Sequence, residues 1–270
     1  MNEFSHKRTW GPKPTYPLVE SYKRPNKDFI TIAGPCSMES PYQLNIIAEK
    51  IKNYSTHLRS GVFKAGTYKG KKFGWIEKSM IKEFHDIANI NGMKNIIEIL
   101  DYRDIDWVSE YADCFQVGAR QTQNYTLLNE VGKTNKPIFL KRNMGMNIDE
   151  WLGAANYILD AGCKELYLIE RGSSTYHCDV RWTPTIHLIP SVQSICNIPI
   201  IWDASHGCGR RDLVSKICLG GVASGADGIL IETHYDPPNS ISDADQTISL
   251  LEFELLMNKI NKMKRFINEE

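Results

Sequence analysis

Short apolar runs alternate with longer amphipathic stretches over most of the chain. The apolar runs predict eight strands, at 30–34, 61–66, 94–100, 113–118, 137–142, 165–170, 199–205 and 227–234. Each run is followed by a stretch with helical spacing, at 43–54, 76–89, 105–111, 126–133, 148–162, 184–196, 211–225 and 244–264. Near-continuous apolar runs are typical of parallel strands that are covered by helices.

Eight strand–helix units predict a closed (β/α)8 TIM barrel, a fold that typically needs about 250 residues. The alternative is an open, doubly wound sheet. No G-x-G-x-x-G motif follows the first apolar run, which weakens the nucleotide-binding form of that alternative. Residues 1–28 are polar and rich in proline and lysine, so we expect an N-terminal arm that caps the barrel bottom or contacts a neighbouring subunit. We expect residues 29–270 to form a single catalytic barrel.

Composition narrows the class of protein. Lys+Arg and Asp+Glu both number 32, and this balance argues against a nucleic-acid binder, which usually shows a basic excess. The seven cysteines are scattered and form no C-x-x-C pair, which indicates a reducing compartment. The N-terminus has no apolar signal region, and no apolar run approaches the roughly 20 residues that span a bilayer. We therefore expect a cytoplasmic protein without a membrane segment.

Cationic residues recur at the carboxyl ends of the predicted strands, where the active site of a TIM barrel forms. They are Arg59, Lys64, Arg120, Lys141 and Arg171. Cations from several strands would repel one another unless they share an anion, so a phosphate or carboxylate ligand is the economical explanation. The alternative is that they form ion pairs with Glu98, Asp101 and Glu170.

A second group at the same end is suited to a metal. It consists of Cys36, His206, Glu232 and Asp243. A thiolate, an imidazole and two carboxylates suit a divalent first-row metal. The alternative is that Cys36 is a buried apolar residue and His206 a structural histidine.

Eight segments in chain order resemble one enzyme family. They are IAGPCSMES, RSGVFKAGT, GARQTQNY, FLKRNM, LIERG, DASHGCGRRDLV, IETHYDP and ISDADQT. They are similar to the 3-deoxy-7-phosphoheptulonate (DAHP) synthases, in the subgroup related to the 3-deoxy-octulosonate 8-phosphate synthases. The resemblance implies a TIM-barrel transferase of aromatic biosynthesis. Such an enzyme condenses phosphoenolpyruvate with an aldose phosphate, erythrose 4-phosphate in this family, and releases phosphate.

The resemblance also implies roles for individual residues. One divalent metal (Mn, Fe, Zn or Co) would be held by Cys36, His206, Glu232 and Asp243. Phosphoenolpyruvate would be held by Arg59, Lys64, Ala119, Arg120, Lys141 and Arg171. For catalysis, Lys64 is the candidate proton donor to the aldehyde oxygen, with a purely electrostatic role as the alternative. Glu98 and Asp101 are candidates to orient Lys64 or the attacking water, with pairing to the arginines as the alternative.

The acceptor side departs from the family pattern. After Lys64 the family usually carries Pro-Arg-Thr-Ser, whereas this chain has Ala-Gly-Thr-Tyr at 65–68. In the family that arginine and threonine help to hold the acceptor phosphate, so Thr67 and Asp203 are the candidate acceptor-binding residues. Lysines 69, 71 and 72 either supply the lost charge or form a solvated loop. The departure leaves two alternatives open: a synthase for a different or unphosphorylated aldehyde, and a non-catalytic barrel that binds phosphoenolpyruvate or metal. Because the family is usually dimeric or tetrameric, we expect a homodimer or homotetramer.

Overall fold

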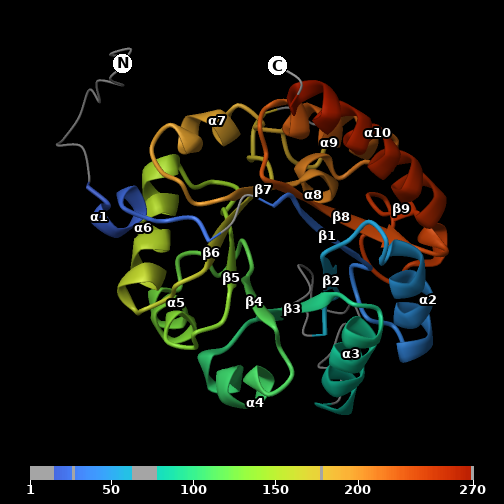
Figure 1. The fold of residues 1–270 in the computed structure, drawn as a ribbon, viewed down its shortest axis with the longest axis horizontal. Coiled ribbons are helices and arrows are strands. Elements are labelled where there is room, and N and C mark those ends of the chain that lie inside the picture. Colours follow the sequence, from blue (N-terminus) through green and yellow to red (C-terminus); the bar gives the residue numbers. More distant parts are fainter. Residues whose placement is uncertain (1–14, 26–27, 63–77, 177–178, 269–270) are drawn as a thin grey trace.

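Eight parallel strands close into a barrel in the computed structural model (Figure 1), which describes residues 15–25, 28–62, 78–176 and 179–268. The strands are β1 (Ile30–Gly34), β2 (His57–Arg59), β3 (Lys94–Ile99), β4 (Cys114–Val117), β5 (Ile138–Lys141), β6 (Leu166–Glu170), β7 (Ile200–Asp203) and β8 (Gly228–His234). Each strand pairs in parallel with the next along the chain, and β8 pairs with β1. The pairing of first and last strands excludes an open sheet and confirms the predicted TIM barrel.

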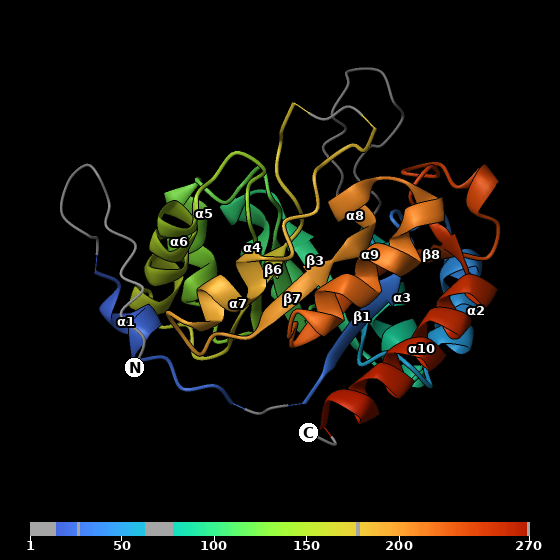
Figure 2. The same cartoon turned by 90° about the horizontal axis from the view of Figure 1, so that it is seen from above.

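Helices form a layer around the strands (Figures 1 and 2). They are α2 (Pro41–Ile51), α3 (Lys78–Ile90), α4 (Ile105–Ser109), α5 (Tyr125–Gly132), α6 (Ile148–Asp160), α7 (Leu188–Gln193), α8 (Ala204–Cys208), α9 (Arg211–Ala223) and α10 (Leu250–Asn268), with short 3-10 turns η1 (Tyr102–Asp104) and η2 (Pro237–Asn239). Side-chain caps set some of the starts: Ser40 accepts from the backbone of Gln43, and Asn147 and Glu150 form a capping box. In the part of the chain that is described, no helix has the length and apolar character needed to cross a membrane.

Several elements differ from the sequence prediction. The predicted strand 199–205 ends at Asp203, where α8 follows, and the predicted helix 244–264 begins only at Leu250, after the two-residue strand Ile248–Ser249. The second strand is His57–Arg59 and not the apolar run at 61–66, because it pairs with β1 and β3 there while Gly61 makes only an isolated bridge to Ser37. The pattern misses this strand because it contains a single apolar residue. Residues 63–66 lie outside the described residues. Helix α7 is shorter than the predicted 184–196, because the Thr185 hydroxyl is held in the preceding loop by Glu170.

The two faces of the strands belong to two separate apolar clusters. The larger cluster joins outward-facing residues to the helices. The smaller one fills the barrel interior and consists of Ile30, Ile32, Ile96, Cys114, Phe139, Tyr167, Ile169, Ile201 and Leu230. Side chains two residues apart share a face of a strand. The residues two positions beyond this cluster therefore also face inward, and most of them are polar: Glu98, Gln116, Lys141, Arg171, Asp203 and Glu232. On β2 the inward residues are His57, whose ring contacts Phe139, and then Arg59.

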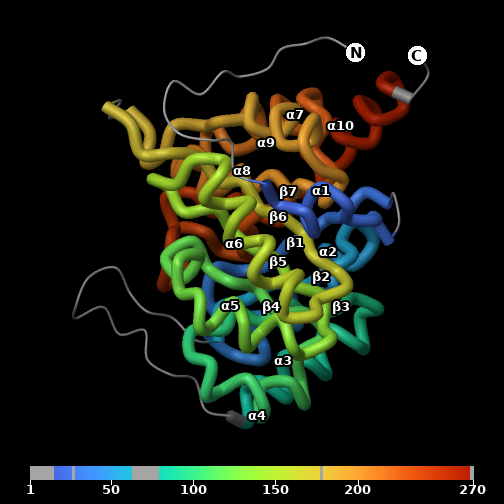
Figure 3. Tube along the Cα trace, turned by 90° about the vertical axis from the view of Figure 1, so that its left-hand side faces the viewer, coloured from blue at the N-terminus to red at the C-terminus, as the bar shows by residue number. Residues whose placement is uncertain are grey.

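The described part of the N-terminal arm runs along the outside of the barrel and reaches the end opposite the polar residues. The Tyr22 hydroxyl accepts from the Leu166 backbone N–H at 3.0 Å, where β6 begins. Arg24 pairs with Asp227, just before β8. The short helix α1 (Pro17–Glu20) packs against α6, which lies beside α5 on the face seen in Figure 3. Tyr22 and Arg24 thus lie at the amino ends of the strands, whereas the Tyr16 hydroxyl donates to the Asp149 carbonyl at 2.7 Å, near the start of α6.

Candidate active site at the polar end of the barrel

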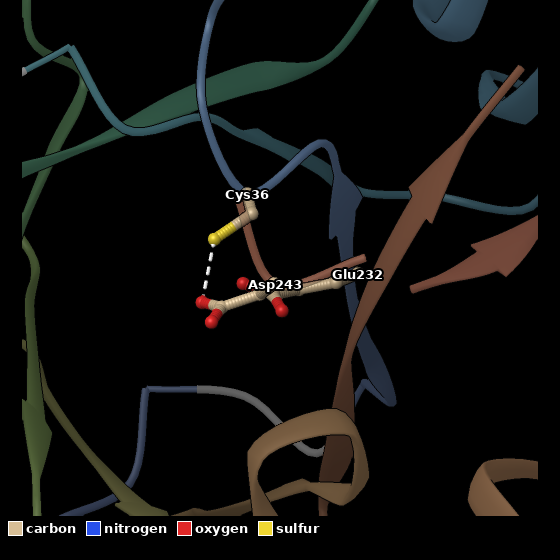
Figure 4. A group of neighbouring side chains, drawn as sticks. All are labelled: Cys36, Glu232 and Asp243. Carbon is tan, nitrogen blue, oxygen red and sulfur yellow. Dashed lines mark hydrogen bonds between the residues drawn. The ribbon is translucent and has the colours of Figure 1, made fainter. Parts of the chain in front are cut away.

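Three of the candidate metal ligands lie together (Figure 4). Cys36, Glu232 and Asp243 each offer one ligand atom, and these atoms lie within 4.8 Å of one another. Cys36 follows β1, Glu232 is in β8, and Asp243 is in the loop before the two-residue strand β9 (Ile248–Ser249). The Cys36 thiol donates to Asp243 Oδ2 at 2.8 Å. A thiol and two carboxylates at this spacing are donors that suit a divalent first-row metal.

Backbone geometry brings Cys36 and Asp243 together. Gly34 has a φ of 146°, and a Cβ there would lie 2.0 Å from the carbonyl oxygen of Arg59, so only glycine lets β1 run this close to β2. Asp243 has a φ of 49°, in the left-handed region that aspartate enters more readily than most residues. Its carbonyl accepts from the backbone N–H groups of Gln246 and Thr247. This closed turn holds the Asp243 carboxylate against the β1 end.

His206 is oriented toward the same group by Asp203. The Asp203 carboxylate accepts from the His206 backbone N–H at 3.1 Å and lies 3.0 Å from Nδ1. Burial lowers the pKa of His206 and outweighs the opposing effect of Asp203. A neutral ring that donates from Nδ1 has its free electron pair on Nε2, and Nε2 lies 3.6 Å from Glu232 Oε1. Metal-binding histidines are commonly oriented by such a carboxylate, so the fourth candidate fits a metal site although it lies outside the group of three.

Three of the predicted cations are buried at the same end. Arg59 Nη1 lies 2.9 Å from Glu232 Oε1, and Lys141 Nζ lies 2.8 Å from Asp203 Oδ2. Arg171 differs from these two in that its guanidinium lies over the ring of Trp182, 5.2 Å from the ring centroid. Its Nε, like that of Arg59, has no hydrogen-bond partner among the described residues. Burial lowers the pKa of Arg171. An arginine that is 5% exposed and incompletely satisfied is suited to an anionic ligand.

The carboxylates proposed as alternative partners of these cations are engaged elsewhere. Glu170 pairs with Arg142 on the outer face of the strands. Asp101 caps η1 and bonds to Arg103, which lowers the pKa of Asp101 to about 2. That pairing prediction is therefore wrong for both.

The other predicted residues differ in where they lie. Glu98 faces inward, accepts from Gln116 Nε2 at 3.3 Å, and packs so closely that a Cβ on Gly118 would lie 2.0 Å from it. Asp203 is fully buried, and its oxygens are taken by Lys141 and His206, which leaves it poorly placed to bind an acceptor. Ala119 and Arg120 follow β4, buried and exposed respectively. Lys64, Thr67 and the lysines at 69, 71 and 72 lie outside the described residues.

Two polar residues of this site were not predicted from the sequence. Arg181 Nη1 lies 3.2 Å from Asp243 Oδ1, and Gln246 Nε2 donates to Glu232 Oε2 at 2.6 Å. Gln246 falls within ISDADQT, one of the segments that carry the resemblance, so its position was the one available signal.

Comparisons with known proteins show the family of the chain. The model of the DAHP synthetase I family matches residues 22–269. Phospho-2-dehydro-3-deoxyheptonate aldolase of Thermotoga maritima is 36% identical over 96% of this chain and 75% of its own length. A crystal structure of that aldolase from Thermotoga maritima superimposes with a TM-score of 0.86, covering 90% of this chain and 71% of the other, at 34% identity. A 2-dehydro-3-deoxyphosphooctonate aldolase of Desulfotalea psychrophila is 26% identical over 89% of this chain and 91% of its own length. The chain belongs to the DAHP synthetase I family.

Proposed function

We propose that the protein condenses phosphoenolpyruvate with an aldose phosphate, erythrose 4-phosphate by resemblance, and forms a 3-deoxy-2-ulosonate and inorganic phosphate. Membership of the family makes the chain a transferase that forms a carbon–carbon bond. The observation that carries the specific proposal is the juxtaposition, inside one barrel end, of the incompletely satisfied Arg171 with the group Cys36, Glu232 and Asp243. Arg171 suits an anionic substrate such as phosphoenolpyruvate, and the group of three suits a divalent metal.

The cations would fix phosphoenolpyruvate. Arg171 and Lys141 reach the barrel interior from neighbouring strands, and Arg59 enters from β2. Together with Arg120, Lys64 and the Ala119 backbone, they would hold the carboxylate and phosphate. Holding both anions restrains the donor in one orientation and stabilises the charge that develops as phosphate departs.

The reaction requires one new carbon–carbon bond and one broken carbon–oxygen bond. C3 of phosphoenolpyruvate attacks the aldehyde carbon, water adds to C2, and the C2–O bond to phosphate then breaks. The aldehyde oxygen gains a proton, for which Lys64 is the proposed donor. Of the two candidates for orienting the water or Lys64, Glu98 faces the interior and Asp101 bonds to Arg103, so we assign that part to Glu98.

Cys36, His206, Glu232 and Asp243 would hold the divalent metal, which when bound supplies Lewis acidity toward the aldehyde carbonyl. Asp203 has a different part in this scheme. Its two contacts orient His206 toward Glu232 and hold the Lys141 ammonium beside the interior. It therefore acts on both halves of the site without contacting the acceptor.

Phosphate release from phosphoenolpyruvate tests the proposal. The purified protein is assayed with erythrose 4-phosphate, arabinose 5-phosphate and their unphosphorylated counterparts, before and after chelation and after metal is restored. We expect release with a phosphorylated aldehyde, loss on chelation and recovery with metal. Release only with unphosphorylated aldehydes would replace the acceptor in the proposal. Binding of phosphoenolpyruvate without turnover of any aldehyde would support the non-catalytic alternative.

A further inference from the structure

Gln246 is a polar side chain enclosed in the active-site end of the barrel. It is 2% exposed. Its Nε2 donates to Glu232 Oε2 at 2.6 Å, and its Oε1 accepts from Arg181 Nη1 at 3.3 Å. The two partners assign the ends of the amide, because a carboxylate only accepts and a guanidinium only donates.

These contacts orient the Glu232 carboxylate. One of its oxygens, Oε1, accepts from Arg59 and lies 3.6 Å from His206 Nε2. The other, Oε2, accepts from Gln246. A carboxylate that is held through both oxygens cannot rotate freely about its last bond, and a hydrogen bond to a charged group is stronger than one between neutral groups. Without the amide, Oε2 would lose the hydrogen bond from Gln246.

Gln246 also belongs to the turn that presents Asp243. Its backbone N–H donates to the Asp243 carbonyl at 3.1 Å, and its Arg181 partner contacts Asp243 Oδ1. One buried residue therefore joins two candidate ligands that come from separate segments, a strand and the loop beyond it. A glutamate in place of Gln246 would bring a second negative charge next to Glu232. An apolar side chain there would remove the hydrogen bond that holds the Glu232 carboxylate.

We propose that Gln246 is a positioning residue for the divalent metal: it aligns the Glu232 carboxylate and locks the Asp243 turn to β8. This inference rests on the proposed function, because it concerns the metal site of that function. Partners that orient metal ligands typically contribute 10- to 100-fold to metal affinity. We expect loss of the amide to act on metal binding in the folded protein and not only on stability.

Titration of the metal-free protein with Co²⁺ tests this inference without relying on activity. Thiolate binding to Co²⁺ gives a near-ultraviolet charge-transfer band, and Cys36→Ala identifies the band that belongs to this site. The variants are Gln246→Met, which keeps the length without the amide, and Gln246→Asn, which is too short to reach both partners. The matched control is Gln193→Met at the opposite end of the barrel, where Gln193 Nε2 donates to Asp227 Oδ2 at 3.2 Å.

We expect Gln246→Met to weaken Co²⁺ binding at least tenfold, Gln246→Asn to weaken it by a smaller factor, and Gln193→Met to leave it within twofold of wild type. Thermal unfolding of the metal-free proteins is measured in parallel to identify variants that are folded at the titration temperature. Co²⁺ affinity within twofold of wild type in both Gln246 variants would overturn the inference alone. A wild-type protein that binds no Co²⁺ through Cys36 would overturn the metal site of the proposed function as well.

Discussion

A buried ion pair between Arg142 and Glu170 joins the carboxyl ends of β5 and β6, next to Lys141 and Arg171. The Glu170 carboxylate accepts from Arg142 Nε and Nη2, from the Gly172 backbone N–H at 2.7 Å and from the Thr185 hydroxyl at 2.7 Å. Glu170 is 0% exposed and Arg142 is 1% exposed. Glu170→Gln keeps the size of the side chain but leaves the guanidinium buried without a counter-charge. Breaking a buried pair from one side costs about 3–5 kcal/mol.

We expect Glu170→Gln to lower the free energy of unfolding by about 3 kcal/mol, at the low end of that range because the amide retains one acceptor. The assay is urea unfolding followed by circular dichroism, with an unchanged dependence on denaturant concentration as the sign that the unfolded state is unaltered. Glu130→Gln is the control, because Glu130 pairs with Lys133 at the surface, where such pairs contribute about 0–1 kcal/mol.

A double-mutant cycle separates this pair from its surroundings. Replacing both Glu170 and Arg142 by methionine removes both charges, so the double variant should lose less stability than the sum of the single variants. A free energy of unfolding for Glu170→Gln within about 1 kcal/mol of wild type would refute the reasoning, since burial of an uncompensated guanidinium at this site could then not be costly.

Three further predictions concern other parts of the barrel. Arg171→Met should weaken phosphoenolpyruvate binding by roughly 10- to 100-fold, which corresponds to the loss of a hydrogen bond to a charged group. It should not lower the melting temperature, because Arg171 Nε has no hydrogen-bond partner among the described residues. Calorimetric titration measures the binding and thermal unfolding the melting temperature, and a clear drop in the melting temperature would contradict the prediction. Cys36→Ala should abolish metal binding and phosphate release together, whereas Cys114→Ala, which removes another buried thiol in the apolar part of the interior, should retain both, as measured by metal analysis and the phosphate assay. Burial lowers the pKa of His57 to about 4 from an ordinary value near 6.5. As the pH falls below 6.5, His57 therefore takes up a proton in the unfolded chain before it does so in the folded protein. The folded protein loses stability over this range, down to about pH 4. His57→Gln should reduce that loss by about 3 kcal/mol in urea unfolding at a series of pH values, and an unchanged pH profile would show that His57 is not the group responsible.

The sequence predicted the strands best where both of their faces are apolar over most of their length. β6 and β8 are buried on both faces, so their residues form continuous apolar runs with clear ends. β2 was misplaced because His57 and Arg59 use its inward positions, which leaves Leu58 alone to indicate a strand. Polar residues that face the barrel interior near the candidate site thus remove the apolar pattern by which a strand is predicted.

The sequence predicted which residues gather at the polar end better than it predicted their pairings, and metal binding there stays a prediction. Cys36, Glu232 and Asp243 converge as the resemblance implies. The partners of Glu170 and Asp101 were not predicted, because strand ends place successive side chains on opposite faces and the bounds of the strands were uncertain by a residue or two. The position of Gln246 is set by the left-handed turn at Asp243, and the sequence Asp-Ala at that point does not predict such a turn.

The ring closes between the first and last strands, and this decides when the site can form during folding. Cys36 and Asp243 are 207 residues apart in the chain. A barrel folded only as far as α8 would contain Cys36 and His206 but neither Glu232 nor Asp243. Bringing such distant segments together is entropically costly and tends to occur late. The group of proposed metal ligands is therefore completed only when the closing strand pair forms, and a nascent or truncated barrel without β8 lacks two of the four.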